Sequence, residues 1–156
     1  MHKIQRTIDI SASAQRVYDF VIQPKNLPGV LPSLIEVSNV VAGTGGGSDY
    51  DWIYKMVGVH LKGHTTIEQA QPGKLLRHRG DGAIQSTWRW TFQGHDGAGM
   101  KLTCEVEYTI PVPVLGKLAE ALVVKLNIRE METMLANVKD MVEHGAASAG
   151  AGARAH

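Results

Sequence analysis

Apolar and polar residues alternate along several stretches of the chain, with the period of two that is typical of β-strands. The clearest stretches are residues 83–94 and 99–110, where aromatic and aliphatic side chains alternate with Thr, Arg, Lys and Glu. This alternation predicts an antiparallel sheet with one apolar face and one solvated face. Similar but shorter patterns predict further strands at residues 3–10, 35–42, 49–58, 60–70 and 74–80.

Helices are predicted on both sides of this series of strands. Ser11 or Ser13 can cap a helix that runs to about Ile22, and the prolines within residues 24–32 break the next segment into short helical pieces. After the last strand, apolar residues recur at steps of three and four. This spacing predicts one long helix from Pro113 to about His144.

The long predicted helix carries two apolar series. The first series consists of Leu115, Leu118, Leu122 and Leu126. The second series consists of Val124, Ile128, Met131, Leu135, Val138 and Val142. At roughly 1.5 Å per residue, a helix of some thirty residues is about 45 Å long and can cross a whole small sheet. We therefore expect this helix to cover the apolar face of the sheet.

Glycine-rich segments are interpreted as turns between strands. The sequence GTGGGS at residues 43–48 lacks the Gly-Lys-Ser/Thr ending of a phosphate-binding loop, and a strand follows it, so we predict a hairpin loop. Residues 94–97 are predicted to close a second hairpin. We expect residues 1–144 to form a single domain and the small-residue segment 145–156 to be a disordered tail.

Composition and charge exclude several classes of function. The chain has 156 residues and a formal net charge of +1, so no strong electrostatic field points to a nucleic-acid partner. No apolar run is long enough to predict a membrane-inserted helix, and no apolar stretch near the start predicts a secretory signal. Cys104 is the single cysteine, which excludes an internal disulfide. These features together predict a cytoplasmic protein.

Five segments occur in an order and spacing that resemble a known family. They are SASAQRVYDFV, WIYKMVGVHLKG, TTIEQAQPGKLLRHRGDG, STWRWTFQGHDGAGMKLTCEVEYTIP and NIREMETMLANVKDMV. Over residues 3–143 the chain resembles the START-like superfamily, SRPBCC, and within it the polyketide cyclase/dehydrase branch. The resemblance implies an α+β helix-grip fold: a curved antiparallel sheet of six to seven strands around a long C-terminal helix, with two short helices after the first strand. The superfamily hosts cyclases, lipid and quinone carriers, hormone receptors and chaperone regulators, so it does not define one function.

A sheet that grips one helix leaves a concave space, which apolar side chains either line or fill. If they line it, we expect the strands to contribute Tyr50, Trp52, Tyr54, Met56, Trp88, Trp90, Cys104, Val106 and Tyr108. From the helix we expect Leu118, Leu122 and Leu126. The phenols would then be the polar groups that orient a ligand.

Candidate catalytic residues are few, and the family has no universal catalytic signature to transfer. Tyr54, His78 and Arg89 are candidates because such side chains can move a proton or hold an enolate. The alternative is that the strand histidines and arginines are solvated or structurally satisfied. His60 and His64 lack a third ligand, so we predict neither a metal nor a cofactor. Cys104 is interpreted as a core residue rather than a nucleophile.

Three functions follow from these observations. The first is binding of a small hydrophobic molecule, such as a lipid, a quinone or a polyketide-like aromatic, in an internal cavity between sheet and helix. The second is a cyclase, aromatase or dehydratase that uses the same cavity. The third is an interaction module of a larger complex, which the charged outer positions Arg89, Lys101, Glu105 and Glu107 disfavour.

Overall fold

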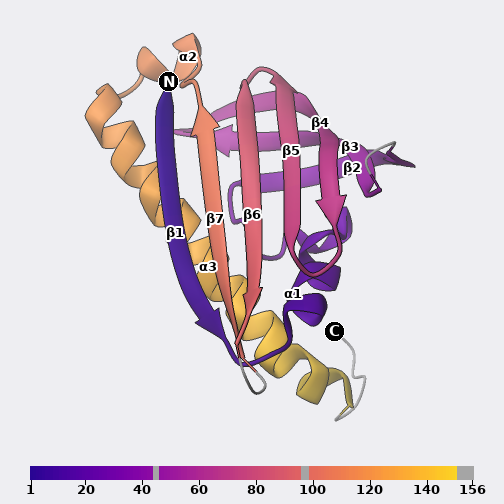
Figure 1. Cartoon of the computed structure of the whole chain (residues 1–156). Coiled ribbons are helices and arrows are strands. Elements are labelled where there is room, and N and C mark those ends of the chain that lie inside the picture. The colour runs from indigo at the N-terminus through magenta and orange to yellow at the C-terminus, as the bar shows by residue number, and fades with distance from the viewer. Residues whose placement is uncertain (44–45, 96–98, 151–156) are drawn as a thin grey trace.

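Seven strands form one antiparallel sheet in the order β1-β7-β6-β5-β4-β3-β2 (Figure 1). The strands are β1 (His2–Ile10), β2 (Leu34–Ala42), β3 (Ser48–Met56), β4 (Val59–Gln71), β5 (Leu75–Gly82), β6 (Ser86–Gly94) and β7 (Met100–Tyr108). The helical elements are α1 (Ala14–Val21), the 3-10 helix η1 (Pro24–Asn26), α2 (Val112–Leu115) and α3 (Glu120–Gly150). This computed structural model describes residues 1–43, 46–95 and 99–150. The predicted helix-grip fold is confirmed.

The sheet curves around α3. In Figure 1, α3 runs diagonally behind β1 and β7, while β2, β3 and β4 cross behind the other strands. Helix α3 contacts β1 and α1, and α1 contacts β6 and β7. One face of the sheet is therefore covered by helices, and the opposite face is left to solvent.

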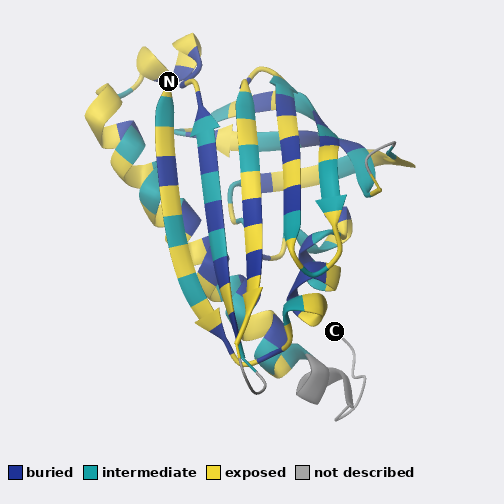
Figure 2. Ribbon diagram, viewed as in Figure 1, coloured by how far each residue is buried: buried dark blue, intermediate teal, exposed yellow. Residues whose placement is uncertain are grey.

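Alternating burial confirms the inner and outer faces of the strands (Figure 2). In β7 the buried side chains are those of Met100, Leu102, Cys104, Val106 and Tyr108. The residues between them are charged or carry a hydroxyl, and they are exposed or partly exposed. The core thus lies between this inner face and the buried face of α3, as the period of two requires.

Local chemistry explains the first helices. The Ser13 hydroxyl accepts a hydrogen bond from the backbone N–H of Arg16 at 3.1 Å, so Ser13 is the N-cap of α1. Val17, Tyr18 and Val21 form its buried face, and the Tyr18 ring packs edge-on against Phe92. Pro24 begins η1, where the missing N–H of proline costs no helical hydrogen bond.

The long helix differs from its prediction at both ends. It does not run unbroken from Pro113: the single turn α2 ends at Leu115 with Gly116 as its C-cap, and α3 begins afresh at Glu120. Glycine loses more conformational entropy in a helix than other residues, which favours a helix end at Gly116. At the other end, α3 continues to Gly150. Residues 151–156 of the predicted tail lie outside the described residues.

The boundary between β3 and β4 also differs from the prediction. The alternation predicts a strand that continues through residues 57 and 58, but Val57 and Gly58 form the two-residue turn between β3 and β4, with φ values of 50° and 77°. Positive φ at both central positions is the geometry of a tight hairpin turn. The predicted hairpins around GTGGGS and residues 94–97 join strands that pair antiparallel, although residues 44–45 and 96–98 lie outside the described ranges.

Polar contacts fix the second half of α3 to the rest of the domain. The Glu143 carboxylate accepts from the backbone N–H of Ser11 at 2.7 Å, and the Arg16 guanidinium donates to the carbonyl of Val142 at 2.7 Å. Further towards the start of the helix, Glu130 and Asn137 bond the loop before β2, as described below. The helix is thereby positioned across the sheet at several separate points.

Candidate functional site

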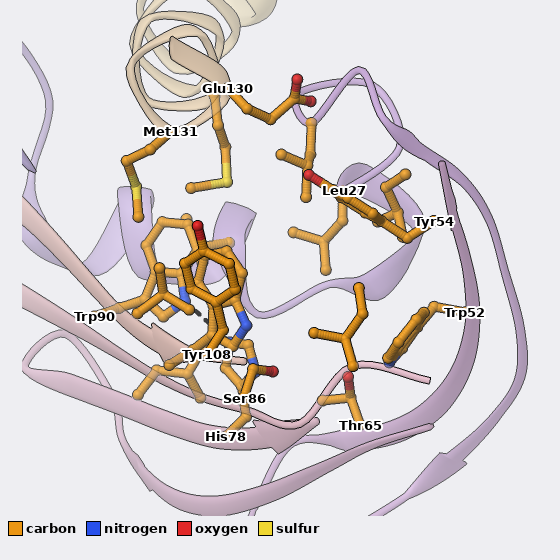
Figure 3. Close-up of a pocket in the computed structure, with 18 of the residues that line it drawn as sticks. Leu27, Trp52, Tyr54, Thr65, His78, Ser86, Trp90, Tyr108, Glu130 and Met131 are labelled. Atoms are coloured by element: carbon orange, nitrogen blue, oxygen red, sulfur yellow. Dashed lines mark hydrogen bonds between the residues drawn. The ribbon is translucent and has the colours of Figure 1, made fainter. Parts of the chain in front are cut away.

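A cavity lies between α3 and the inner face of the sheet, with a volume of about 130 Å³ (Figure 3). The predicted strand residues that line it are Tyr50, Trp52, Tyr54, Met56, Trp88, Trp90, Val106 and Tyr108. They come from β3, β6 and β7, and alternation directs all of them towards the concave side. The sheet and the helix therefore face one another without complete contact.

The remaining predicted lining residues lie elsewhere. Cys104 is fully buried in the core. Leu118 is partly buried and packs against the core. Leu122 and Leu126 are exposed, with 46% and 45% of their surface accessible, so the prediction that they face the cavity is corrected. Leu115 and Leu118 precede α3, which starts at Glu120 after a break, so the spacing of the whole leucine series does not set which side of α3 turns inward.

The cavity has further lining residues that sequence reasoning did not assign to it. From α3 they are Asn127, Glu130, Met131 and Met134. From the segment after α1 they are Leu27, Leu31 and Leu34. Thr65, His78 and Ser86 project from the sheet (Figure 3). The two polar helix residues gave no sequence signal, because a period of apolar positions says nothing about the polar residues between them.

His78 on β5 is buried against two tryptophans of β6. The Trp90 indole N–H donates to His78 Nε2 at 3.0 Å, and the Trp88 ring stacks on the imidazole with an interplanar angle of 10° and 5.8 Å between centroids. Burial lowers the pKa of His78 to about 3, so the ring is neutral at physiological pH. Among the residues that the structure describes, His78 Nδ1 has no hydrogen-bond partner.

The buried neutral ring of His78 predicts a loss of stability in acid. In the unfolded chain His78 titrates near its ordinary pKa of about 6.5. The unfolded state therefore binds more protons than the folded state between about pH 6.5 and the folded pKa of about 3. Across that window we expect this one group to lower the free energy of unfolding by roughly 1 kcal/mol for each pH unit as pH falls.

Urea unfolding at a series of pH values, for the wild type and His78→Gln, measures this contribution. The wild type should lose stability below about pH 6.5 faster than the variant, since glutamine does not titrate. Hydrogen bonds lower the pKa of carboxylates such as Asp51 and Glu143, so their protonation in acid destabilises both proteins. This contribution cancels when the two stability curves are subtracted. Parallel curves for the two proteins would contradict the assignment.

The tyrosines of the cavity stay protonated. Burial raises the pKa of Tyr50 to about 12, against a hydrogen bond with Thr65 that lowers it. Burial also raises the pKa of Tyr54, and the nearby negative charge of Glu130 raises it further. Both phenols therefore act as neutral hydrogen-bonding groups, not as bases.

Polar groups converge from three elements at one part of the cavity. The Asn127 amide donates to the Tyr108 hydroxyl at 2.7 Å, which leaves the phenol hydrogen free to donate elsewhere. One Glu130 oxygen accepts from the backbone N–H of Ser33 at 2.8 Å. The charge of Glu130 and the phenol of Tyr108 both raise the pKa of Tyr54. Helix α3, β3 and β7 thus supply a small polar region to an otherwise apolar cavity.

Other candidate residues lie outside the cavity. Arg89 is exposed on the outer face of β6, opposite Arg77 and Glu105, so it cannot contact a molecule in the cavity as the catalytic prediction required. His60 and His64 also lie on the outer face, where His64 Nδ1 is 2.6 Å from an Asp51 oxygen. Burial raises the pKa of the Cys104 thiol, as expected for a core residue. In the described ranges, no three His, Cys, Asp or Glu side chains cluster as metal ligands.

This fold and this cavity define a helix-grip domain with an internal, mainly apolar chamber. Residues 1–143 match the model of the family described as polyketide cyclase / dehydrase and lipid transport. The chain belongs to that family. Among curated proteins, no sequence matches it. Within the part of the chain that the structure describes, no helix combines the length and the apolar character needed to cross a membrane.

Solved structures share the fold at low sequence identity. A START superfamily protein from Mycobacterium smegmatis superposes with a TM-score of 0.75 at 15% identity, over 92% of this chain and 99% of that one. A protein from Thermus thermophilus gives a TM-score of 0.71 at 22% identity, over 92% and 99%. The Zhui aromatase/cyclase from Streptomyces sp. R1128 gives 0.71 at 14% identity, over 92% and 94%. At these identities the similarity establishes the fold alone.

Proposed function

We propose that this protein binds a small, largely apolar molecule in the cavity between α3 and the sheet. The observation that carries the proposal is the lining itself: aromatic and aliphatic side chains surround the space, with a few polar groups at defined places. Ligand sites of proteins have this composition, in which apolar surface supplies affinity and a few polar groups set orientation. The family description, which includes lipid transport, is consistent with binding.

The volume of the cavity limits the ligand. Sites for drug-sized molecules usually enclose about 300–1,000 Å³, whereas an engineered apolar cavity of about 150 Å³ binds benzene. With about 130 Å³, this cavity accommodates a molecule of about one aromatic ring. A longer lipid or polyketide-like chain would require α3 or the segment 27–34 to move outward. We therefore favour a compact aromatic ligand over a full-length lipid.

Binding is expected to be visible at the tryptophans. The chain has three, and all of them line the cavity. Titration with α-methylstyrene, a neutral one-ring molecule, should shift the three indole N–H signals in a ¹H–¹⁵N NMR spectrum. Native mass spectrometry of the purified protein should detect any molecule that remains bound after purification. Unshifted indole signals at saturating α-methylstyrene would contradict the proposal.

A cavity-filling variant provides the matched control. Val106 lies on the inner face of β7, and Val106→Phe should weaken binding at least about tenfold by occupying the space. Glu107→Gln changes the next residue on the outer face and should leave binding unchanged. Both variants need a urea unfolding midpoint close to that of the wild type, so that a loss of binding is not a loss of folding.

A second candidate function is catalysis on a carbonyl substrate by the same cavity. The observation in its favour is the convergence of Tyr54, Tyr108 and Glu130 described above. Against it, His78 is neutral with one nitrogen already accepting a hydrogen bond, and the tyrosine pKa values are raised rather than lowered. Recovery of an added ligand unchanged in mass supports binding, and recovery of a product supports catalysis.

A further inference from the structure

Part of the leucine series that the sequence predicted to face the sheet lies on the outer surface of the molecule. Among the described residues, nine large apolar side chains are exposed, and four of them fall within residues 112–126. They are Val112, Leu115, Leu122 and Leu126. Figure 2 shows α2 and the first turn of α3 mostly exposed. Exposed apolar side chains that gather in one place indicate a binding surface, whereas scattered ones need no explanation.

Helical spacing places apolar and basic side chains side by side on this surface. Leu122 and Leu126 are four residues apart on α3, and so are Lys125 and Arg129. Leu122 also lies three residues before Lys125, and Leu126 lies three residues before Arg129. Because residues three and four apart are neighbours on a helix, the four side chains form one exposed group. Helix α2 lies next to the start of α3 in Figure 1 and continues this group with its own exposed apolar pair.

Three basic residues accompany the apolar side chains. Lys117, Lys125 and Arg129 are exposed, and none of them forms a salt bridge with any side chain that the structure describes. The α2–α3 surface, as we define it, consists of Val112, Leu115, Lys117, Leu122, Lys125, Leu126 and Arg129. It therefore combines apolar area with positive charge.

The acidic residues of the same segment are directed towards other partners. Glu120 lies 3.4 Å from His2 Nε2, and Glu132 accepts a hydrogen bond from Arg6 Nε at 3.1 Å; both partners belong to β1. Glu130 accepts a hydrogen bond from the backbone before β2, as described above. The α2–α3 surface thus keeps a net positive charge.

This combination argues for a lipid surface and against a second copy of the chain. In a two-fold symmetric dimer the same patch of both subunits meets, so the three cations of one protomer would face those of its partner. A membrane with anionic lipids presents negative headgroups directly above an apolar layer, so it satisfies both kinds of side chain at once. Helices that lie in a membrane interface have this composition, with leucine on the buried side and Lys or Arg beside it.

We propose that the α2–α3 surface binds the protein reversibly to membranes that contain anionic lipids. The four apolar side chains enter the headgroup layer, and the three cations contact lipid phosphates. Such binding is peripheral and needs no helix that crosses the membrane. Leu126 lies about one helical turn before Glu130, which lines the cavity, so the bound membrane lies close to the cavity. The proposal does not depend on which molecule the cavity holds.

Co-sedimentation of the full chain with lipid vesicles tests the proposal. The wild type should sediment with vesicles made of equal parts of phosphatidylcholine and phosphatidylglycerol, and much less with phosphatidylcholine alone. Added salt should weaken the binding, because salt screens exposed charges. Absence of binding to the anionic vesicles, or equal binding to both kinds, would overturn the proposal.

A double variant tests the charges. Lys125→Gln combined with Arg129→Gln should weaken binding to the anionic vesicles about tenfold or more, since each cation near such a surface contributes about fivefold. Arg89→Gln combined with Lys101→Gln removes the same charge from the outer face of the sheet, and this control should bind nearly as the wild type does. Equal losses for the two double variants would show a general effect of net charge and contradict the proposed surface.

A second double variant tests the apolar side chains. Leu122→Ser combined with Leu126→Ser should also weaken binding about tenfold or more. The matched control is Val40→Ser combined with Val41→Ser, which changes two exposed valines of β2 and should leave binding unchanged. A loss in the valine variant as large as that in the leucine variant would count against the proposal. Each variant needs a urea midpoint close to that of the wild type.

The wild type decides if a variant does not fold. Spin-labelled phosphatidylglycerol in bicelles should broaden the backbone amide NMR signals of residues 112–129 more than those of β4, β5 and β6, and broadening centred on the strands would overturn the proposal. Sedimentation velocity without lipid should show a monomer. A dimer that Leu122→Ser with Leu126→Ser dissociates would assign the surface to a second copy instead.

Discussion

Gly63→Ala should destabilise the protein by about 3 kcal/mol or more and abolish ligand binding. Gly63 on β4 pairs with Trp52 on β3, and a β-carbon there would lie less than 3.0 Å from the Trp52 ring and from the backbone carbonyl of Asp81. The ring could move only towards the cavity that it lines, and the carbonyl belongs to the paired strand β5. Overpacking of a core usually costs about 1–3 kcal/mol, and backbone overlap adds to it because no rotamer relieves it.

Urea unfolding of Gly63→Ala measures this effect, with Gly116→Ala as the control. Gly116 has a φ of −74°, and a β-carbon there would be 3.8 Å from its nearest neighbour, so its replacement should change stability by less than about 0.5 kcal/mol. Equal stability of the two variants would mean that Trp52 does not lie over Gly63.

Leu135→Ala should cost about 2–5 kcal/mol, whereas Leu126→Ala on the same helix should cost less than about 0.5 kcal/mol. Leu135 is 2% exposed against the sheet, and its truncation leaves a void in the core. Leu126 is 45% exposed, so its side chain contributes little burial. The pair has the same chemistry and the same helical context, which makes the comparison a direct test of which face of α3 meets the sheet.

The measurement is the urea midpoint of each variant, together with the slope of the transition. An unchanged slope with a lower midpoint for Leu135→Ala identifies a loss of native-state stability. A larger loss of stability for Leu126→Ala than for Leu135→Ala would show that the leucine series faces the sheet, as the sequence predicted.

The sheet could be predicted from the sequence because alternation of apolar and polar residues reports directly on its two faces. The same alternation assigned Trp52, Trp88 and Trp90 to the inner face, and all three line the cavity. The turn at Val57 and Gly58 was not predicted, because valine rarely adopts positive φ. That residues near the cavity actually hold a ligand stays a prediction.

The helix was less predictable for a physical reason. Two apolar series overlap on the sequence of α3, and spacing alone does not rank them; in the structure Met131, Leu135, Val138 and Val142 are buried, whereas Leu122 and Leu126 are exposed. His78 was considered as a candidate on its residue type, but its neutral form depends on burial, which the packed structure alone defines. Asn127 and Glu130 line the cavity because of the orientation of α3 about its own axis, which only the packed structure defines.

The attachment of the loop before β2 has a consequence for how this family can change its ligand. Glu130 and Asn137 bond to the backbone N–H of Ser33 and the backbone carbonyl of Val30, not to side chains. Leu27 and Leu31, in the same stretch, supply side chains to the chamber. Substitution of these leucines can therefore change the shape of the cavity while the backbone hydrogen bonds of the loop remain. Ligand selectivity can thus change during evolution without a change of fold.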